Sequence, residues 1–379
     1  MMMEVRLGDY IKEYSVRNKN DEDIPVYSVT NTQGFCQDYF SKEVASKDRT
    51  TYKIVPRGFF AYNPSRINVG SVDWQRHEDR VIVSPLYNVF SVSPELNQQY
   101  LYYYLKSDIT LHFIKELATG SVRDNLKLSM LYEFSINIPA YEEQEKVIKR
   151  LDLLQSIISL RRKELMKLDE LIKARFVELF GDPVQNPFQW NTKPLLEMGY
   201  CKNGMNFHTG DSGIEIHCLG VGDFKDYSVI DDTERLPTIS LNEMPSEENM
   251  LQDGDIVFVR SNGNKALVGR CLVVYPRSTP TTYSGFCIRY RLASSDVDTA
   301  YLLRVLKSDS MRKKMVGRGA NIQNLNQQIL ASLDIPIPPM TMQEQFAAFV
   351  AQVDKSKLLA KIKSLLLNTE RGLILNKQA

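Results

Sequence analysis

The chain has 379 residues, 43% hydrophobic and 25% charged, which is ordinary for a globular protein large enough to form at least two cores. Its formal net charge of +1 excludes a general electrostatic attraction to nucleic acid or membranes, so an anionic partner must be met by local patches. No apolar run approaches the roughly 18 residues of a membrane span, and the start "MMMEVRLGDY" has no signal-peptide core. We expect a cytoplasmic protein with no membrane partner.

The first 140 residues predict a globular unit that mixes strands and helices. Segments such as "RVIVSPLYNVFSV" (residues 80–92) are typical of strands, and residues 99–117 predict one amphipathic helix. The unit ends in "SINIP" (residues 135–139), an apparent strand end directly before a helix start.

A long helix is predicted from residue 142 to residue 180, a stretch without proline or glycine. Its apolar residues follow a 4-3 spacing that Arg161 and Arg175 interrupt, so the helix needs a partner helix. At 1.5 Å per residue it would be about 58 Å long. The apolar stripe consists of Val147, Leu151, Leu154, Ile158, Leu165, Leu168, Ile172 and Leu179.

Residues 183–340 predict a second globular unit, with a strand at "CIRYRL" (residues 287–292) and one amphipathic helix at residues 299–316. A second long helix follows from residue 343 to about residue 373. Because a globular unit separates the two long helices, they would pair most simply in antiparallel orientation and act as a spacer. The expected apolar face of the second helix is Phe346, Phe349, Val350, Val353, Leu359, Ile362, Leu366 and Leu373.

The two halves of the chain repeat one another. "YLYYYLKSD" (residues 100–108) matches "YLLRVLKSD" (residues 301–309), and "GSVRDNLKLSMLYEFSINIP" (residues 120–139) matches "GANIQNLNQQILASLDIPIP" (residues 319–338). The starts differ by 201 residues in the first pair and by 199 in the second, so one two-residue insertion or deletion separates the blocks. Such a repeat indicates an internal duplication. The duplicated units could also be two fused domains that merely associate through their helices.

Several motifs in one fixed order resemble those of a known family. They are "YNPSRINVGS" (residues 62–71), "LKSD" in both halves, "GANIQNLNQQILASLDIPIPP" (residues 319–339), "EEQEKV" and "QEQF" at the helix starts, and "ELFGDP" (residues 178–183). Over essentially its whole length the chain is similar to specificity subunits of type I restriction-modification systems. The "Ile-x-Ile-Pro" motif then marks where each globular unit is joined to its long helix.

The resemblance implies an α+β fold with two similar α/β target-recognition domains, at residues 1–140 and 183–340. Helical segments at residues 141–182 and 341–379 would form an antiparallel coiled coil, giving a pseudo-twofold internal duplication. It also implies that the partners are double-stranded DNA with a bipartite target, two methyltransferase (modification) subunits, and motor-nuclease (restriction) subunits held through the modification subunits.

Two pairs of polar loops contain the residue types that contact DNA. Arginine can bond guanine in a fork, asparagine or glutamine can bond adenine, and lysine and arginine neutralise phosphates. In the first half the candidates are Tyr62, Asn63, Ser65, Arg66, Asn68, Arg76, Arg123 and Lys127. In the second half they are Arg260, Asn262, Asn264, Lys265, Arg270, Arg318, Asn321 and Gln323. Plain turn and helix-cap chemistry would also explain the asparagines and glycines in these loops.

Catalytic motifs are incomplete. "AYNPSR" differs from the Asn-Pro-Pro-aromatic motif of amino-methyltransferases at Ser65 and Arg66, and "LGVGDF" (residues 219–224) stands in the other half of the duplication. The five cysteines show no CxxC spacing, and the nearby histidines match no zinc pattern. We expect no catalytic residue, cofactor or metal, and a chain that is no enzyme by itself. The alternatives are a specificity subunit of a fused cutting-and-modifying (type IIB-like) system, and a coiled-coil interaction protein that does not bind DNA.

Overall fold

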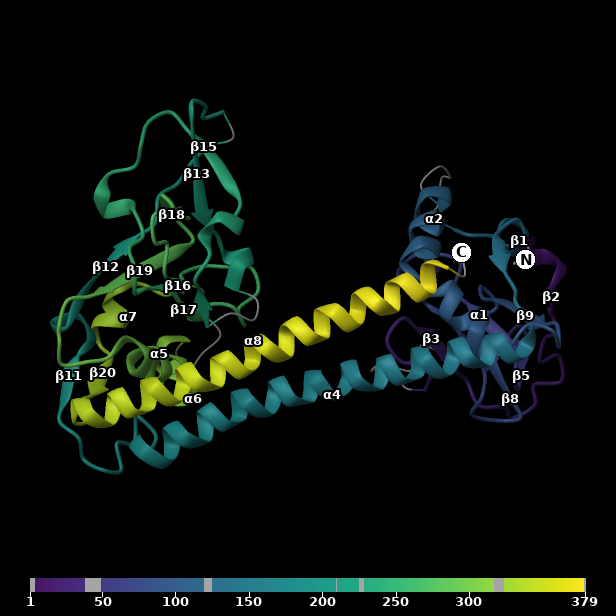
Figure 1. The fold of residues 1–379 in the computed structure, drawn as a ribbon, viewed down its shortest axis with the longest axis horizontal. Coiled ribbons are helices and arrows are strands. Elements are labelled where there is room, and N and C mark those ends of the chain that lie inside the picture. The colour runs from purple at the N-terminus through teal and green to yellow at the C-terminus, as the bar shows by residue number, and fades with distance from the viewer. Residues whose placement is uncertain are drawn as a thin grey trace. The chain divides into compact units, whose positions relative to one another are not determined.

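The structure is a computed structural model that describes residues 4–37, 49–118, 125–208, 210–224, 228–316 and 324–377. Its contacts divide the chain into two compact units (Figure 1). Unit 1 consists of Met1–Glu164 with Leu359–Ala379, and unit 2 is Leu165–Leu358. Each unit therefore combines one globular head with part of each long helix.

Unit 1 is built on a four-stranded antiparallel sheet with the order β2-β9-β6-β7. Central strand β6 places Tyr62 opposite Asn88 of β9 and opposite Val72 of β7. Phe60 and Phe90 are fully buried and stack in this sheet with ring centroids 5.1 Å apart. The strands are β2 (Ile11–Glu13), β6 (Phe60–Tyr62), β7 (Val72–Trp74) and β9 (Asn88–Val92).

Three strand pairs complete the head of unit 1. They are β1 (Glu4–Arg6) with β10 (Ser135–Asn137), β3 (Ser28–Thr30) with β4 (Gly34–Cys36), and β5 (Lys53–Pro56) with β8 (Arg80–Val83). The β1-β10 pair joins the first residues of the head to the "SIN" segment directly before the first long helix. Short helical turns are η1 (Leu7–Asp9), η2 (Ile67–Val69) and α3 (Leu128–Leu131).

The single helix predicted in each head is instead two helices, and the "LKSD" motif is the break. Unit 1 has α1 (Gln98–Leu105) and α2 (Asp108–Ala118), and unit 2 has α5 (Thr299–Lys307) and α6 (Asp309–Val316). The serine side chain starts the second helix, because Ser107 Oγ accepts from Thr110 N at 3.2 Å and Ser308 Oγ from Met311 N at 3.3 Å. Serine favours this capping role over a helix interior, which the apolar periodicity alone did not reveal.

Unit 2 repeats the sheet of unit 1 and enlarges it. Its main sheet has the order β12-β19-β16-β17-β14, so its first four strands correspond to β2-β9-β6-β7, and β11 pairs with β20 as β1 does with β10. A second sheet, β15-β13-β18, contains a parallel pair, β13 with β18, which in unit 1 corresponds to a single parallel bridge between Val26 and Ile82. The strands are β11 (Thr192–Pro194), β12 (Gly199–Asn203), β13 (Ile214–Leu219), β14 (Val229–Ile230), β15 (Thr238–Leu241), β16 (Asp255–Val259), β17 (Cys271–Val274), β18 (Thr281–Tyr283), β19 (Cys287–Leu292) and β20 (Asp334–Pro336). The remaining short turns are η3 (Leu195–Glu197), η4 (Val221–Phe224), η5 (Thr233–Arg235), η6 (Glu247–Asn249) and α7 (Gln327–Ala331).

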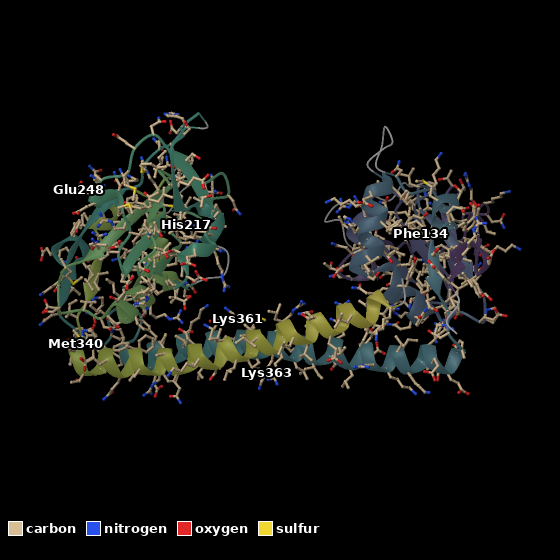
Figure 2. The ribbon with its side chains drawn as sticks, turned by 45° about the horizontal axis from the view of Figure 1, so that its top comes forward. Phe134, His217, Glu248, Met340, Lys361 and Lys363 are labelled. Carbon is tan, nitrogen blue, oxygen red and sulfur yellow. The ribbon has the colours of Figure 1, made fainter. Side chains whose placement is uncertain are left out.

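Two arginines of β19 hold the segment that leads into β16, residues 248–255, against the sheet. Arg291 bonds the buried Asp255 carboxylate through two nitrogens, at 2.8 and 2.7 Å. The neighbouring Arg289, which is also buried, donates to the carbonyl oxygen of Glu248 at 3.0 Å. Glu248, labelled in Figure 2, also pairs with Lys202 at 2.5 Å. These charges are therefore committed to the fold of unit 2.

A buried glutamine joins the head of unit 1 to the first long helix. Gln144, in the first turn of α4, donates to the carbonyl oxygens of Glu95 at 2.8 Å and Pro139 at 2.9 Å. Its side-chain oxygen accepts from Asn97 N at 2.8 Å. Because Asn97 caps α1, one side chain connects the end of the sheet, the start of α1 and the start of α4.

Unit 2 has the same junction. Gln343 donates to the carbonyl oxygens of Asp296 at 3.1 Å and Pro338 at 2.8 Å, and accepts from Asp298 N at 2.9 Å. Asp298 caps α5 as Asn97 caps α1. The sequence motif therefore repeats because each head is joined to its long helix by the same set of hydrogen bonds.

The two long helices are α4 (Tyr141–Phe180) and α8 (Met340–Asn376). In unit 1 the beginning of α4 packs against the end of α8: Leu151 clusters with Leu375, and Arg150 pairs with Glu370 at 2.7 Å. In unit 2 the end of α4 packs against the beginning of α8, where the rings of Phe176 and Phe346 are 5.5 Å apart. The pairing is antiparallel within each unit.

The expected apolar face of α8 is only partly correct. Phe346 and Val353 are buried, but the exposed fractions of Leu359, Ile362, Leu366 and Leu373 are 59%, 47%, 64% and 60%. Small Ala360, at 3% exposed, occupies the inner face. Counting only large apolar residues therefore selected the wrong face in the second half of the helix.

Candidate nucleic-acid interface

The first predicted loop of unit 1, residues 63–71, connects β6 to β7. Asn63 Oδ1 accepts from Ser65 N at 3.1 Å and from Ser65 Oγ at 2.9 Å, which fixes the first turn. Gly70, with φ of +84°, turns the chain into β7. Asn63 and Ser65 thus shape the loop, and Asn68 is half-buried within it.

Arg66 is the one cation in the sequence of this loop. Its side chain is exposed, and with the other described residues its guanidinium makes neither a hydrogen bond nor an ion pair. An arginine held on a fixed turn with its fork unoccupied can bond a base edge or a phosphate.

Tyr62 is a correction to the predicted site, because it is fully buried in β6. Its hydroxyl donates to the carbonyl oxygen of Leu126 at 3.1 Å and accepts from Asn88 at 2.9 Å. Burial raises the pKa of this phenol well above its ordinary value. The strand alternation that directs Tyr62 inward was overlooked beside the polar residues that follow it.

Arg76 is exposed but already paired within the head. Its guanidinium bonds both oxygens of Asp73 at 3.1 and 3.2 Å and lies over the Trp74 ring, 4.9 Å from the centroid. Asp73 is 1% exposed, and burial raises the pKa of its carboxyl, although Arg76 and the N–H groups of Phe35 and Trp74 oppose the rise. Arg76 therefore compensates a buried charge in the head.

The corresponding loop of unit 2, residues 260–270, is longer and also internally bonded. Asn262 Oδ1 accepts from Asn264 N at 2.8 Å, and Asn264 Oδ1 accepts from Ala266 N at 3.0 Å. Lys265 is exposed at the tip. Arg312 of α6 donates to the carbonyl oxygens of Ala266 and, at 3.4 Å, of Val268. Successive turns thus present the asparagines and the lysine on an ordered loop.

The two arginines of this loop are less exposed than Arg66. Arg260 is half-buried, and its guanidinium donates to the carbonyl oxygen of Gly285 at 3.4 Å, a long bond that leaves its other donors available. Arg270 is half-buried at the end of the loop. Its carbonyl oxygen accepts from Val259 N, at the base of the loop, at 2.9 Å.

In both units the second predicted loop ends against the first. Leu126 N donates to the carbonyl oxygen of Pro64 at 3.1 Å, and Leu325 N donates to that of Arg260 at 2.8 Å. Lys127, next to Leu126, is exposed. The structure thus brings together segments about sixty residues apart in the sequence. Four predicted residues of the second loops lie outside the described ranges: Arg123, Arg318, Asn321 and Gln323.

One neighbour of these loops in each unit was not among the predicted residues. The turn before β9 carries Leu86, and the turn before β19 carries Phe286, whose carbonyl oxygen accepts from Arg260 N at 2.8 Å. The shared serines in "SPLYN" (residues 84–88) and "SGFCI" (residues 284–288) were the available signal.

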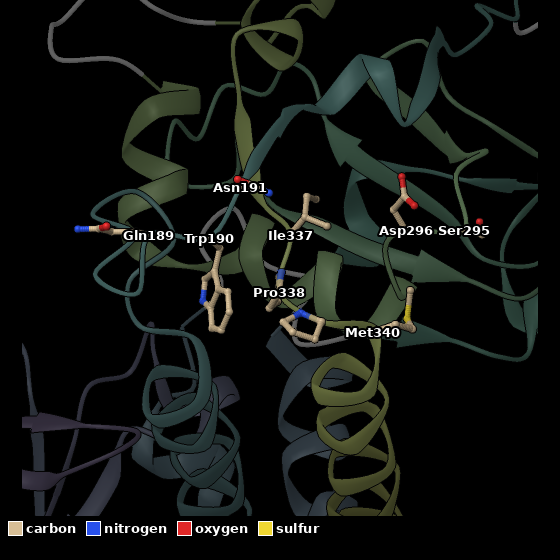
Figure 3. A pocket seen from close by; sticks show the side chains of 9 residues that line it. Gln189, Trp190, Asn191, Ser295, Asp296, Ile337, Pro338 and Met340 are labelled. Carbon is tan, nitrogen blue, oxygen red and sulfur yellow. The ribbon is translucent and has the colours of Figure 1, made fainter.

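Other features of the described chain do not form a competing site. An open pocket of about 530 Å³ lies at the start of α8, lined by Trp190, Pro338 and Met340 among others, and contains none of the predicted residues (Figure 3). Among the described residues no cluster of three or more His, Cys, Asp and Glu side chains could hold a metal ion. No described helix has the length and apolarity to cross a bilayer.

Comparison with known proteins decides the family. The profile of the "Type I restriction modification DNA specificity domain" matches residues 2–170 and 213–368. The chain belongs to this family. It is a DNA specificity subunit of a type I restriction-modification system.

Individual proteins similar to this specificity subunit come from type I restriction-modification systems as well. The type I restriction enzyme StySPI specificity subunit of Salmonella potsdam is 23% identical over 393 aligned positions, covering 95% of this chain and 84% of that protein. The S subunit of the type I restriction-modification system from M. genitalium has a TM-score of 0.51 at 14% identity, over 100% of this chain and 96% of that one. A chain from a structure that addresses complex assembly and conformational transition of the type I R-M system has a TM-score of 0.60 at 17% identity. The match covers 99% of this chain and 96% of that one. These two likenesses support the same fold.

Proposed function

We propose that this specificity subunit recognises a bipartite double-stranded DNA target, with one half-site contacted by the paired loops of each unit. The observation that carries the proposal is the repeated loop pair. In each unit an ordered polar loop follows the central strand, and the second loop ends against it through an equivalent backbone hydrogen bond.

The chemistry of the two loops suits different sequences. Unit 1 presents Arg66 and Lys127 as exposed cations, whereas unit 2 presents Arg260 beside Asn262, Asn264 and Lys265. Arginine prefers guanine and asparagine prefers adenine in the major groove. Because the side chains differ while the backbone is alike, the half-sites should differ in sequence. The cations also contribute sequence-independent phosphate contacts.

Two modification subunits would bind the long helices. Large apolar side chains are exposed at positions separated by the 199-residue offset of the duplication: Leu160 and Leu359 at 60% and 59%, and Met166 and Leu365 at 64% and 67%. Equivalent apolar positions on both helices support two equivalent docking sites. The restriction subunits would join through the modification subunits, and the chemical steps would belong to these partners.

The test is substitution of the loop arginines in the complex with its modification subunits. Arg66→Ala and Arg260→Ala should each weaken binding to the methylated target sequence by about 1–3 kcal/mol, because a forked base contact is lost. Binding of a random duplex should change much less. Equal losses on both duplexes would assign these arginines to phosphates, and unchanged binding would remove them from the interface.

Each unit offers a matched control at the opposite end of the same central strand. Arg57 precedes β6 and Arg277 contacts Asp253, which precedes β16. Their side chains are 57% and 64% exposed. Arg57→Ala and Arg277→Ala remove the same positive charge away from the loops, so target affinity should stay within twofold of the unaltered complex.

A further inference from the structure

Each unit carries a turn of the same construction directly before the strand that pairs with its central strand. In unit 1 Ser84 O accepts from Tyr87 N at 3.0 Å, and Ser84 Oγ accepts from Leu86 N at 3.5 Å. In unit 2 Ser284 O accepts from Cys287 N at 2.8 Å, and Ser284 Oγ accepts from Phe286 N at 3.3 Å. The third residue of both turns, Leu86 or Phe286, is consequently held in the same setting.

That third residue is a large apolar side chain in water. Leu86 is 77% exposed and Phe286 is 60% exposed, while the residues that follow them, Tyr87 and Cys287, are 9% and 0% exposed. A single exposed apolar residue needs no explanation. Exposure at the equivalent position of both units indicates a feature that the duplicated heads share.

Both turn tips lie beside the polar loops. In unit 2 the carbonyl oxygen of Phe286 accepts from Arg260 N at 2.8 Å and from Ser261 N at 3.3 Å. In unit 1 Tyr62, directly before the loop, pairs with Asn88, two residues after Leu86, and its hydroxyl accepts from the Asn88 side chain at 2.9 Å. Each apolar tip therefore borders the first residues of the loop that presents the arginine.

We propose that Leu86 and Phe286 are specificity-determining contacts, each packing against the C5 methyl group of one thymine in the half-site of its unit. The proposal rests on the proposed DNA-reading function. Among the groups that base pairs present in the major groove, the thymine methyl is the apolar one, and the neighbouring arginines and asparagines supply the hydrogen bonds. An apolar tip that removes water from this methyl distinguishes thymine from cytosine, which lacks it.

The experiment uses the complex of the chain with its modification subunits and a duplex of the sequence that this complex methylates, as mapped on genomic DNA. Leu86→Ala and Phe286→Ala should each weaken binding about five- to tenfold, as expected for a few apolar groups losing a buried contact. The slope of affinity against salt should not change, because no charge is removed.

Uracil, which lacks the methyl group, is then placed at each thymine in turn. One thymine per half-site should show a loss with the unaltered protein and no further loss with the alanine variant of the matching unit, since both changes remove one contact. Val16→Ala in unit 1 and Met244→Ala in unit 2, 46% and 50% exposed, are the controls and should leave affinity unchanged.

Three results would overturn the proposal: unchanged affinity in both variants, a loss that adds to that of uracil at every thymine, or a loss that reflects weaker assembly with the modification subunits. The additive result would point to a wedge between base pairs instead. An unaltered complex that binds target and random duplexes equally would refute DNA reading itself, which is a different failure.

Discussion

At the scale of single residues, arginines only ten positions apart have different roles in the first head. The fork of Arg66 is unoccupied by other described residues, whereas Arg76 bonds both oxygens of the buried Asp73. Both belong to polar segments of similar composition, "YNPSRINVGS" and "DWQRHEDR". The sequence does not reveal that Asp73, three residues before Arg76, is buried and pairs with that arginine.

This difference predicts a loss of stability for one substitution and almost none for the other. Arg76→Ala should lower the free energy of unfolding by about 1–3 kcal/mol, because it leaves Asp73 buried without its cation. Arg66→Ala should change it by less than about 0.5 kcal/mol, as for an exposed surface residue. Urea unfolding of the two variants checks this, and equal stability would mean that the Asp73–Arg76 pair contributes nothing.

The stability lost in the Arg76→Ala variant should also depend on pH. The pKa of Asp73 is raised in the folded protein, so the folded state binds this proton more tightly than the unfolded chain does. Such a group favours folding below its ordinary pKa of 3.8, and that contribution is lost as pH rises through the folded-state value. Without Arg76 the pKa should rise further, so the variant should lose more stability at pH 7 than at pH 4.

At the scale of elements, periodicity located the helices but not their breaks or faces. It joined α1 to α2 because apolar residues continue across the "LKSD" motif, while the break depends on one serine side chain. It chose large residues as the inner face of α8, while small Ala360 lies there. Both errors arise because hydrophobic spacing does not include capping or close approach of helices.

The exposed face of the long helices gives a testable consequence. Leu160→Glu and Leu359→Glu should each weaken association with the modification subunit by at least tenfold, because a charge would be buried in an apolar contact. Neither change should unfold the chain, since both side chains are about 60% exposed. Titration of the purified modification subunit measures this effect.

Leu160→Met and Leu359→Met are the matched controls for that experiment. They keep an apolar side chain of similar volume at the same positions, so association should be nearly unchanged. If the glutamate and methionine variants bind the modification subunit equally well, the docking surface lies elsewhere.

At the scale of the whole molecule, the internal duplication was the most informative property of the sequence. Matching segments predicted two similar heads, and the shared strand order β2-β9-β6-β7 and β12-β19-β16-β17 confirms them. The sheet β15-β13-β18 of unit 2 was not predicted, because the strongly matching segments, residues 100–139 and 301–338, do not include it. Which loop residues contact bases depends on the side chains' surroundings, which a single sequence does not show.

Duplication predicts that the heads act independently on DNA. Replacing residues 1–140 with the equivalent segment of another family member should change one half of the methylated sequence and leave the other half intact. Methylation mapping of genomic DNA gives the result. A change in both halves, or in neither, would show that the two heads do not recognise separate half-sites.

The junction glutamines explain why such exchanges can succeed. Gln144 and Gln343 bond only main-chain atoms of their heads: two carbonyl oxygens and one N–H in each case. A connector that recognises the backbone places little demand on the side chains it joins. Recombination between genes could therefore pair unrelated heads in one chain, and a host lineage would gain new sequence preferences without refining a new joint each time.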